Sequence, residues 1–165
     1  MNVIKYNPLY SIMRYSHLKT MRRIQFPRKN IGKEILLKDS NKNRIFLEID
    51  ILSKSGEPKS GNAIFKIIFH SPKISPEIII KRTKLTIPFF SGLPGFCTKQ
   101  FMVNKEERTF SGKYEWETVE MAKNYARSYA IKFMKRRSDP FPISYEIIDK
   151  STGKIVESSS NNINQ

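Results

Sequence analysis

Two stretches of the chain carry the hydrophobic pattern of β-strands. Between residues 45 and 52 every second residue is isoleucine or leucine, and the residues between them include Glu48 and Asp50. Alternation with a period of two is typical of a strand with one buried and one wetter face. Residues 63–70 are instead apolar on both sides, apart from Lys66 and His70. A strand of that kind needs cover on both faces.

Two other segments have the spacing of amphipathic helices. The first begins at Ser75, a residue type that caps helix N-termini, continues through Pro76, and is ended or bent by Pro88. The second covers residues 119–137, where apolar residues recur at spacings of three and four and basic residues fill the last turn. The basic cluster at this end suits the negative pole of the helix dipole.

Three further strands complete the predicted domain. They cover residues 96–103, 109–117 and 143–148. Together with the strand at residues 63–70 and the two helices, they follow the order βαββαβ, which is the ferredoxin-like arrangement. We therefore expect an α+β fold with a four-stranded antiparallel sheet and an extra N-terminal strand, in a domain that covers residues 44–155.

The helices of such a fold cover one face of the sheet, so the other face needs a cover of its own. The strand at residues 63–70 is apolar on both faces, and Phe101 and Met102 point to opposite faces. An uncovered second face would be a large exposed apolar patch. We therefore expect a homodimer that forms through the sheet face.

The chain is basic, with 30 Lys and Arg against 15 Asp and Glu and a formal net charge of +15. Part of this charge lies in a basic N-terminal extension, residues 1–43, in which the first acid is Glu34. An arginine-bearing, acid-free N-terminus is typical of mitochondrial import sequences, but the same composition fits a disordered arm or a nucleic-acid-binding arm. Residues 156–165 form a polar tail that we expect to be disordered.

No apolar run reaches the roughly 18–20 residues that a membrane helix needs. Cys97 is the single cysteine, so an internal disulfide is excluded. We expect a soluble intracellular protein, either of the cytoplasm or of the mitochondrial matrix.

Motifs of the common catalytic classes are missing from the sequence. There is no glycine-rich phosphate loop, no Cys/His metal-ligand spacing and no Gly-x-Ser-x-Gly. Hydrolase, kinase, nucleotide-dependent and zinc-dependent functions all lose support, and no metal site is predicted. His70, at the end of an apolar strand, is a candidate general base near neutral pH, whereas a lone histidine without an orienting carboxylate is more often structural.

Residues 92–128 carry a resemblance to a known family. Their Gly-Leu-Pro-Gly-Phe turn, lysine-bearing strand, Gly-x-Tyr-x-Trp-Glu strand end and Ala-x-x-Tyr helix resemble the antibiotic-biosynthesis-monooxygenase-like group of the dimeric α/β barrel superfamily. The resemblance implies a ferredoxin-like protomer with a pocket between sheet and helices, packed sheet to sheet on a second copy. Some members of that group oxygenate phenolic polyketides without metal or flavin, others degrade haem, and many have no known activity.

The resemblance carries few functional residues over to this chain. Trp116, the only tryptophan, matches the strand-end tryptophan that characterised members place in their pocket. Where cofactor-free members have an asparagine and a tyrosine, this chain has Gly112 and Ala122, and where haem degraders have their histidine ligand it has Ala126. The resemblance therefore disfavours haem and implies no cofactor, while the known oxygenase constellation is largely absent.

Aromatic residues around the tryptophan form a candidate ligand pocket. Tyr114 and Trp116 share one face of a strand, and Tyr125 and Tyr129, four residues apart, share one side of the next helix. Together they predict a pocket for a small aromatic or apolar ligand; the alternative is that the same rings only fill the core. Trp116 and His70 are the candidate catalytic residues.

Three classes of function stay open. The first is a cofactor-independent monooxygenase-like protein that binds a small apolar or aromatic ligand, and the second is a non-catalytic structural or regulatory dimer of the same fold. The third, an RNA-binding module, is disfavoured because the strand that should carry its stacking rings has Glu115 and Glu117, which repel phosphate. Lys66 and Lys99 also lie on strands, either directed into the pocket or at its rim.

Overall fold

The structure is a computed structural model that describes residues 7–36 and 42–159. The helices are α1 (Pro8–Thr20), α2 (Pro76–Thr86), α3 (Pro88–Ser91), α4 (Val119–Ala126) and α5 (Tyr129–Ser138). The strands are β1 (Ile24–Gln25), β2 (Glu34–Leu36), β3 (Lys42–Ile51), β4 (Ala63–His70), β5 (Phe96–Asn104), β6 (Thr109–Trp116), β7 (Ser144–Asp149) and β8 (Ile155–Ser158). Within these described ranges, no helix is long and apolar enough to cross a membrane.

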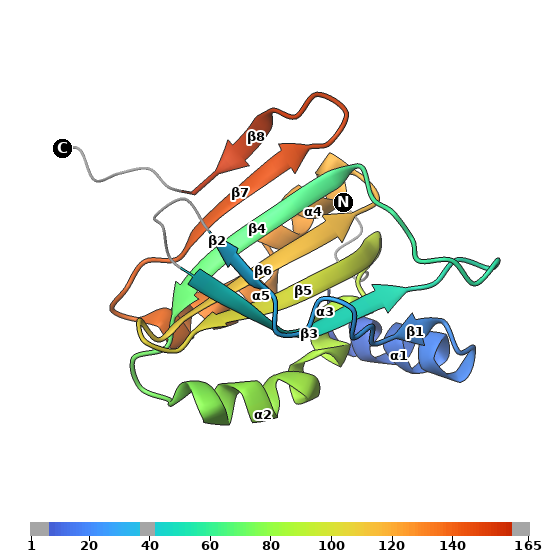
Figure 1. Cartoon of the computed structure of the whole chain (residues 1–165). Helices are drawn as coiled ribbons and strands as arrows, with labels where there is room; N and C mark the ends of the chain where they lie inside the picture. Colours follow the sequence, from blue (N-terminus) through green and yellow to red (C-terminus); the bar gives the residue numbers. More distant parts are fainter. Residues whose placement is uncertain (1–6, 37–41, 160–165) are drawn as a thin grey trace.

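All the strands belong to one antiparallel sheet, and α4 and α5 lie behind it in Figure 1. The strand order is β1-β3-β5-β6-β4-β7-β8, with β2 also paired to β3. From β4 to β7 the elements follow the predicted βαββαβ order, with α2 and α3 in the first crossover and α4 and α5 in the second. The predicted α+β class with an antiparallel sheet is confirmed. The sheet is larger than predicted: β3 takes the place of the expected extra N-terminal strand, β1 and β2 also pair with β3, and β8 extends the other edge.

The register of the central strands gathers large apolar side chains on the face toward the helices. Phe65 on β4 pairs with Tyr114 on β6 and with Ile147 on β7, and Tyr114 pairs in turn with Lys99 on β5. The side chains of Phe65, Tyr114 and Ile147 are completely buried. Because alternate residues of a strand point to opposite faces, this one row fixes which side of each strand builds the core.

The helix predicted over residues 119–137 is broken into two. Helix α4 ends at Ala126, and α5 begins at Tyr129 after Ser128, whose backbone is extended. Serine has a lower helix propensity than alanine or leucine, although the hydroxyl of Ser128 makes no capping hydrogen bond to α5. The break gives α5 its own direction, and α5 packs beside β4.

The N-terminal segment packs against the rest of the domain over residues 7–36. The carboxamide of Asn7 caps α1 by accepting from the N–H of Tyr10 at 3.1 Å. The buried hydroxyl of Ser11 donates to the carbonyl of Pro88 at 2.8 Å, and Arg14 donates to the carbonyl of Leu93 at 2.8 Å. The expectation of disorder is wrong for residues 8–36, because they form α1, β1 and β2.

The C-terminal expectation is also corrected in part. Strand β8 (Ile155–Ser158) pairs with β7, so the polar tail predicted from residue 156 begins inside a strand. The remainder of that tail, residues 160–165, lies outside the described residues.

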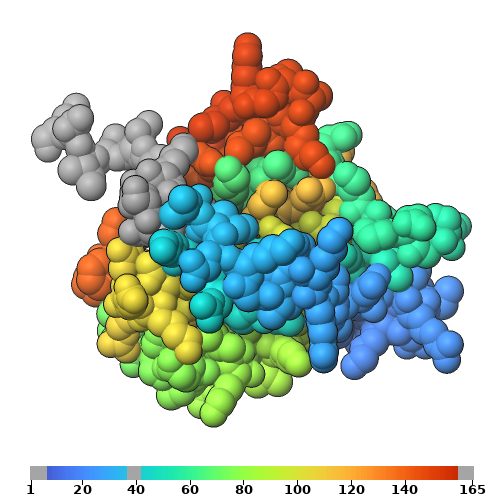
Figure 2. All heavy atoms as spheres, viewed as in Figure 1, coloured from blue at the N-terminus to red at the C-terminus, as the bar shows by residue number. Residues whose placement is uncertain are grey.

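The face of the sheet away from the helices is polar at its centre. Lys66 pairs with Glu146 at 3.2 Å on this face, and Glu48 accepts a hydrogen bond from Gln100 at 2.7 Å. Residues of the N-terminal segment, blue in Figure 2, lie across part of it. The prediction that this face is a large apolar patch is therefore wrong, because alternate residues of β3, β5 and β6 place charged and amide groups there. The homodimer remains a prediction, but an exposed apolar sheet face no longer supports it.

Replacing Gly92 by alanine is expected to loosen α1 from the domain. A methyl group at this position would overlap the backbone carbonyl of Ser11, so α1 or the loop has to shift. Overpacking of this kind lowers the free energy of unfolding by about 1–3 kcal/mol. Chemical denaturation measures the loss, and Ser16→Ala on the exposed side of α1 is the control, expected within about 0.5 kcal/mol of the wild type. Equal losses in the two variants would contradict the docking of α1.

Candidate functional site

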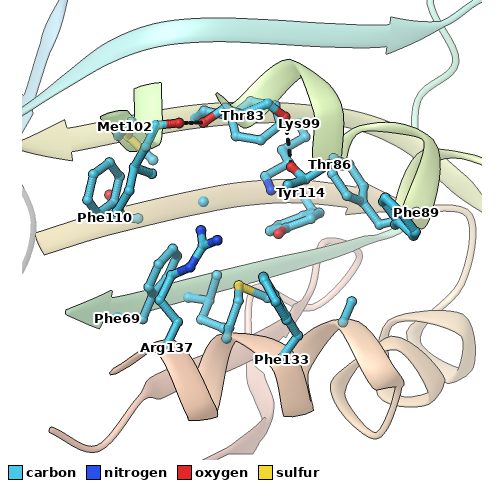
Figure 3. Close-up of a pocket in the computed structure, with 18 of the residues that line it drawn as sticks. Phe69, Thr83, Thr86, Phe89, Lys99, Met102, Phe110, Tyr114, Phe133 and Arg137 are labelled. Carbon is cyan, nitrogen blue, oxygen red and sulfur yellow. Dashed lines mark hydrogen bonds between the residues drawn. The ribbon is translucent and has the colours of Figure 1, made fainter. Parts of the chain in front are cut away.

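A cavity of about 440 Å³ lies between the sheet and the helices. Strands β4, β5 and β6 form its floor, α2 and α3 form one wall, and α5 forms the opposite wall (Figure 3). Most of the side chains that line it are apolar, among them Ile67, Phe69, Phe101, Phe110, Phe133 and Met134. A volume of this size within an apolar lining is typical of a small-molecule site.

Gly112 on β6 keeps part of the floor free of side chain. A methyl group there would come within 2.7 Å of the Tyr114 ring and 3.3 Å of the Lys99 side chain. Glycine inside a strand often marks such a close approach. The residue that replaces the family's asparagine therefore leaves room for the neighbouring Tyr114 and Lys99 on the cavity floor.

Lys99 is the buried basic group of the floor. Its amine lies 3.8 Å from the ring centre of Phe101 and 4.3 Å from those of Phe90 and Tyr114. None of the described carboxylates pairs with it, and burial lowers the pKa of Lys99 well below its ordinary value. The three ring faces favour the ammonium, whereas taking a lone cation out of water costs several kcal/mol. The amine is therefore a buried basic group without a carboxylate partner, and burial disfavours its charged form.

Two of the predicted tyrosines are linked at the floor. The hydroxyl of Tyr125 donates to that of Tyr114 at 2.9 Å, and both side chains are fully buried. Burial raises the pKa of both phenols, so they stay protonated near neutral pH. Tyr129 also lines the cavity, and its hydroxyl oxygen has no hydrogen-bond partner in the described part of the chain. The structure thus places Tyr114, Tyr125 and Tyr129 in the lining of one cavity, although Tyr125 lies on α4 and Tyr129 at the start of α5 rather than on one side of a single helix.

The two candidate catalytic residues do not reach this cavity. Trp116 is completely buried behind Tyr125, with ring centres 4.8 Å apart, and is not among the lining residues. It fills the core, which corrects the prediction that it contacts a ligand. His70 stacks on Phe141 at 4.6 Å, also away from the cavity lining. Neither side chain is placed to act on a molecule bound there.

Two arginines that the sequence analysis did not select line the cavity. Arg82 lies on α2 and is exposed, and Arg137 lies on α5, half-buried beside the ring of Phe133 at 4.8 Å. The sequence held a signal for Arg137, because it stands four residues after Phe133 and so continues the apolar stripe of the helix. That signal was overlooked because basic residues at a helix C-terminus already have a structural reason.

The two lysines left open by the sequence are now assigned. Lys99 belongs to the floor of the cavity, whereas Lys66 lies on the opposite face of the sheet in its pair with Glu146.

Cys97 is buried, and burial raises its pKa to about 12, so it is not a nucleophile near neutral pH. Over residues 7–36 and 42–159, no group of three His, Cys, Asp or Glu side chains is placed to hold a metal ion.

No family model and no curated protein matches the sequence. Among solved structures, the chain is similar to an uncharacterised ferredoxin-fold protein of Listeria monocytogenes that is related to antibiotic biosynthesis monooxygenases. The match covers 69% of this chain and 67% of the other, with 13% sequence identity and a TM-score of 0.48. It is the same group that residues 92–128 resemble. Because both the sequence identity and the TM-score are low, the similarity concerns the fold alone, and no later argument rests on it.

Replacing Lys99 by methionine is expected to stabilise the protein near neutral pH. The folded chain binds a proton at this lysine less readily than the unfolded chain, because burial lowers the pKa of Lys99, so wild-type stability rises with pH up to the ordinary lysine pKa of about 10.4. Methionine fills the same space without a charge to desolvate, and should raise the free energy of unfolding near pH 7 by about 1–3 kcal/mol. Denaturation curves between about pH 7 and pH 10 should show the wild type catching up with the variant.

Lys66→Met on the outer face is the matched control for this prediction. That side chain is part-exposed beside Glu146, so its loss should change stability by less than about 1 kcal/mol. A Lys99→Met protein that is less stable than the wild type over the whole pH range would show that the amine is charged in the folded state.

Proposed function

We propose that this protein binds a small, flat, weakly acidic aromatic compound in the cavity between sheet and helices, and oxygenates it without metal or flavin. The observation that carries the proposal is the buried amine of Lys99, which lies among ring faces on the floor of an apolar cavity and pairs with none of the described carboxylates. Apolar and aromatic walls suit an aromatic body. A lone pair in a site shielded from water suits the removal of a proton from an acidic methylene or phenol.

The chemistry of the proposal starts with Lys99. Its amine takes a proton from a methylene group of the bound compound, and the resulting carbanion is delocalised into the aromatic system. The carbanion gives its electron pair to dioxygen, a C–O bond forms, and the Lys99 ammonium returns the proton to the peroxide. Loss of water then leaves a carbonyl, so that CH₂ and O₂ become C=O and H₂O. Tyr114, kept protonated, is a hydrogen-bond group beside the reacting atoms.

Two alternatives have less support from the site. An RNA-recognition module stacks bases on rings of an open sheet face, whereas Tyr114 and Trp116 are completely buried under the helices. A purely structural dimer gives no reason for a cavity of about 440 Å³ with an unpaired amine on its floor. A cavity in a protein core lowers the free energy of unfolding. Ligand binding is a functional reason for a protein to keep such a cavity.

The proposal is tested first by binding. The probe is 1,8-dihydroxyanthrone, a flat tricyclic phenol with an acidic methylene, titrated under nitrogen while the intrinsic fluorescence is followed. Ala130→Phe places a ring inside the cavity and should weaken binding at least about tenfold by occupying its space. Lys132→Phe puts the same ring on the exposed side of the same helix and should leave binding unchanged.

Oxygen uptake then separates an enzyme from a binder. We expect one dioxygen consumed per carbonyl formed, at a rate that Lys99→Met lowers by about 100-fold or more while the dissociation constant changes less than about threefold. Binding without enzyme-dependent oxygen uptake would overturn the oxygenase and leave a non-catalytic ligand-binding protein. The absence of binding would overturn the proposed function altogether.

A further inference from the structure

Two guanidinium groups from opposite walls line the same cavity. Arg82 comes from α2 and Arg137 from α5, and Figure 3 shows Arg137 pointing from its helix into the cavity. Phe89 and Phe133 line the cavity and are still half-exposed, so this side of it opens to solvent. The arginines therefore lie at the rim, while Lys99 and Tyr114 lie on the floor.

Neither of these arginines has an acidic partner in the described part of the chain. Of the other described arginines, Arg44 pairs with Glu34 and Arg127 pairs with Glu157. Burial and the nearby positive charge of Arg82 both lower the pKa of Arg137. Two like charges that are held together without a counterion raise the energy of the empty site, and an anion between them would lower it.

The surroundings hold Arg137 in place for such an anion. Its guanidinium lies over the ring of Phe133 at 4.8 Å, a stacking contact that orients the planar fork. A fork held in this way presents paired N–H donors in the geometry of a carboxylate. On the floor, in contrast, Lys99 is buried among ring faces, and burial disfavours its charged form.

We propose that Arg82 and Arg137 form an anion site at the rim of the cavity, and that the ligand is an aromatic carboxylic acid whose carboxylate binds there while its apolar body enters the cavity. This inference rests on the proposed ligand site and adds the charge and the orientation of the ligand. The end of the molecule opposite the carboxylate is then the one that reaches Lys99.

The test compares two probes of one shape, anthraquinone-2-carboxylate and anthraquinone-2-carboxamide. The wild type should bind the carboxylate at least about tenfold more tightly than the amide. This preference should shrink when the salt concentration rises from about 50 to about 500 mM, because part of the site is open to solvent. Arg137→Met should abolish the preference, Arg82→Met should reduce it, and Arg137→Lys should restore only part of it because the bidentate fork is lost.

Arg136→Met is the matched control, since it removes the same charge from an exposed position of α5 that does not line the cavity. It should keep the full preference for the carboxylate. Equal affinity of the wild type for both probes would overturn the anion site and leave the proposed cavity function intact. Failure of both probes to bind would overturn the cavity function and the anion site with it. Loss of the preference in Arg136→Met as well would show only a general attraction of the basic chain for anions.

Discussion

The buried amine of Lys99 is the constraint on which the site depends. It stands in the middle of the sheet, between Ile49 and Tyr114 on the neighbouring strands, with ring faces around it and none of the described carboxylates in a pair with it. In such surroundings the cost of keeping a charge exceeds what the rings return. Burial thus lowers the pKa of this amine, and a buried base of this kind suits the proposed removal of a proton.

The cavity has chemically different ends, and this difference follows from how the two crossovers are built. Helix α2 and helix α5 belong to different crossovers, and each places one arginine at the rim. Arg82 is exposed and Arg137 is half-buried, whereas the amine on the floor is buried. Under the proposed function, a ligand with one charged end and one aromatic end would be oriented by this difference, and orientation is a large part of what an active site contributes.

The face of the sheet away from the helices is polar at its centre and partly covered by the chain itself. Ion pairs and amide contacts occupy its centre, and the N-terminal segment lies across part of it (Figure 2). A second copy is therefore not required to hide an apolar patch. The same segment anchors the other side of the molecule as well, because Arg14 on α1 holds the turn that leads into β5.

The sequence by itself determined the types and the order of the elements from β4 to β7, because periods of two and of three to four are local properties that neighbouring residues impose. The sequence also indicated that Tyr114 and Trp116 share one face of a strand, but the break between α4 and α5 means that helical spacing does not explain how Tyr125 and Tyr129 come to line one cavity. Only the tertiary structure decided that Trp116 is filler while Lys99 is exposed to the cavity, because this depends on strand register and on how closely the helices approach. It also decided the meeting of Arg82 and Arg137, which stand on helices from separate crossovers and which no local pattern relates.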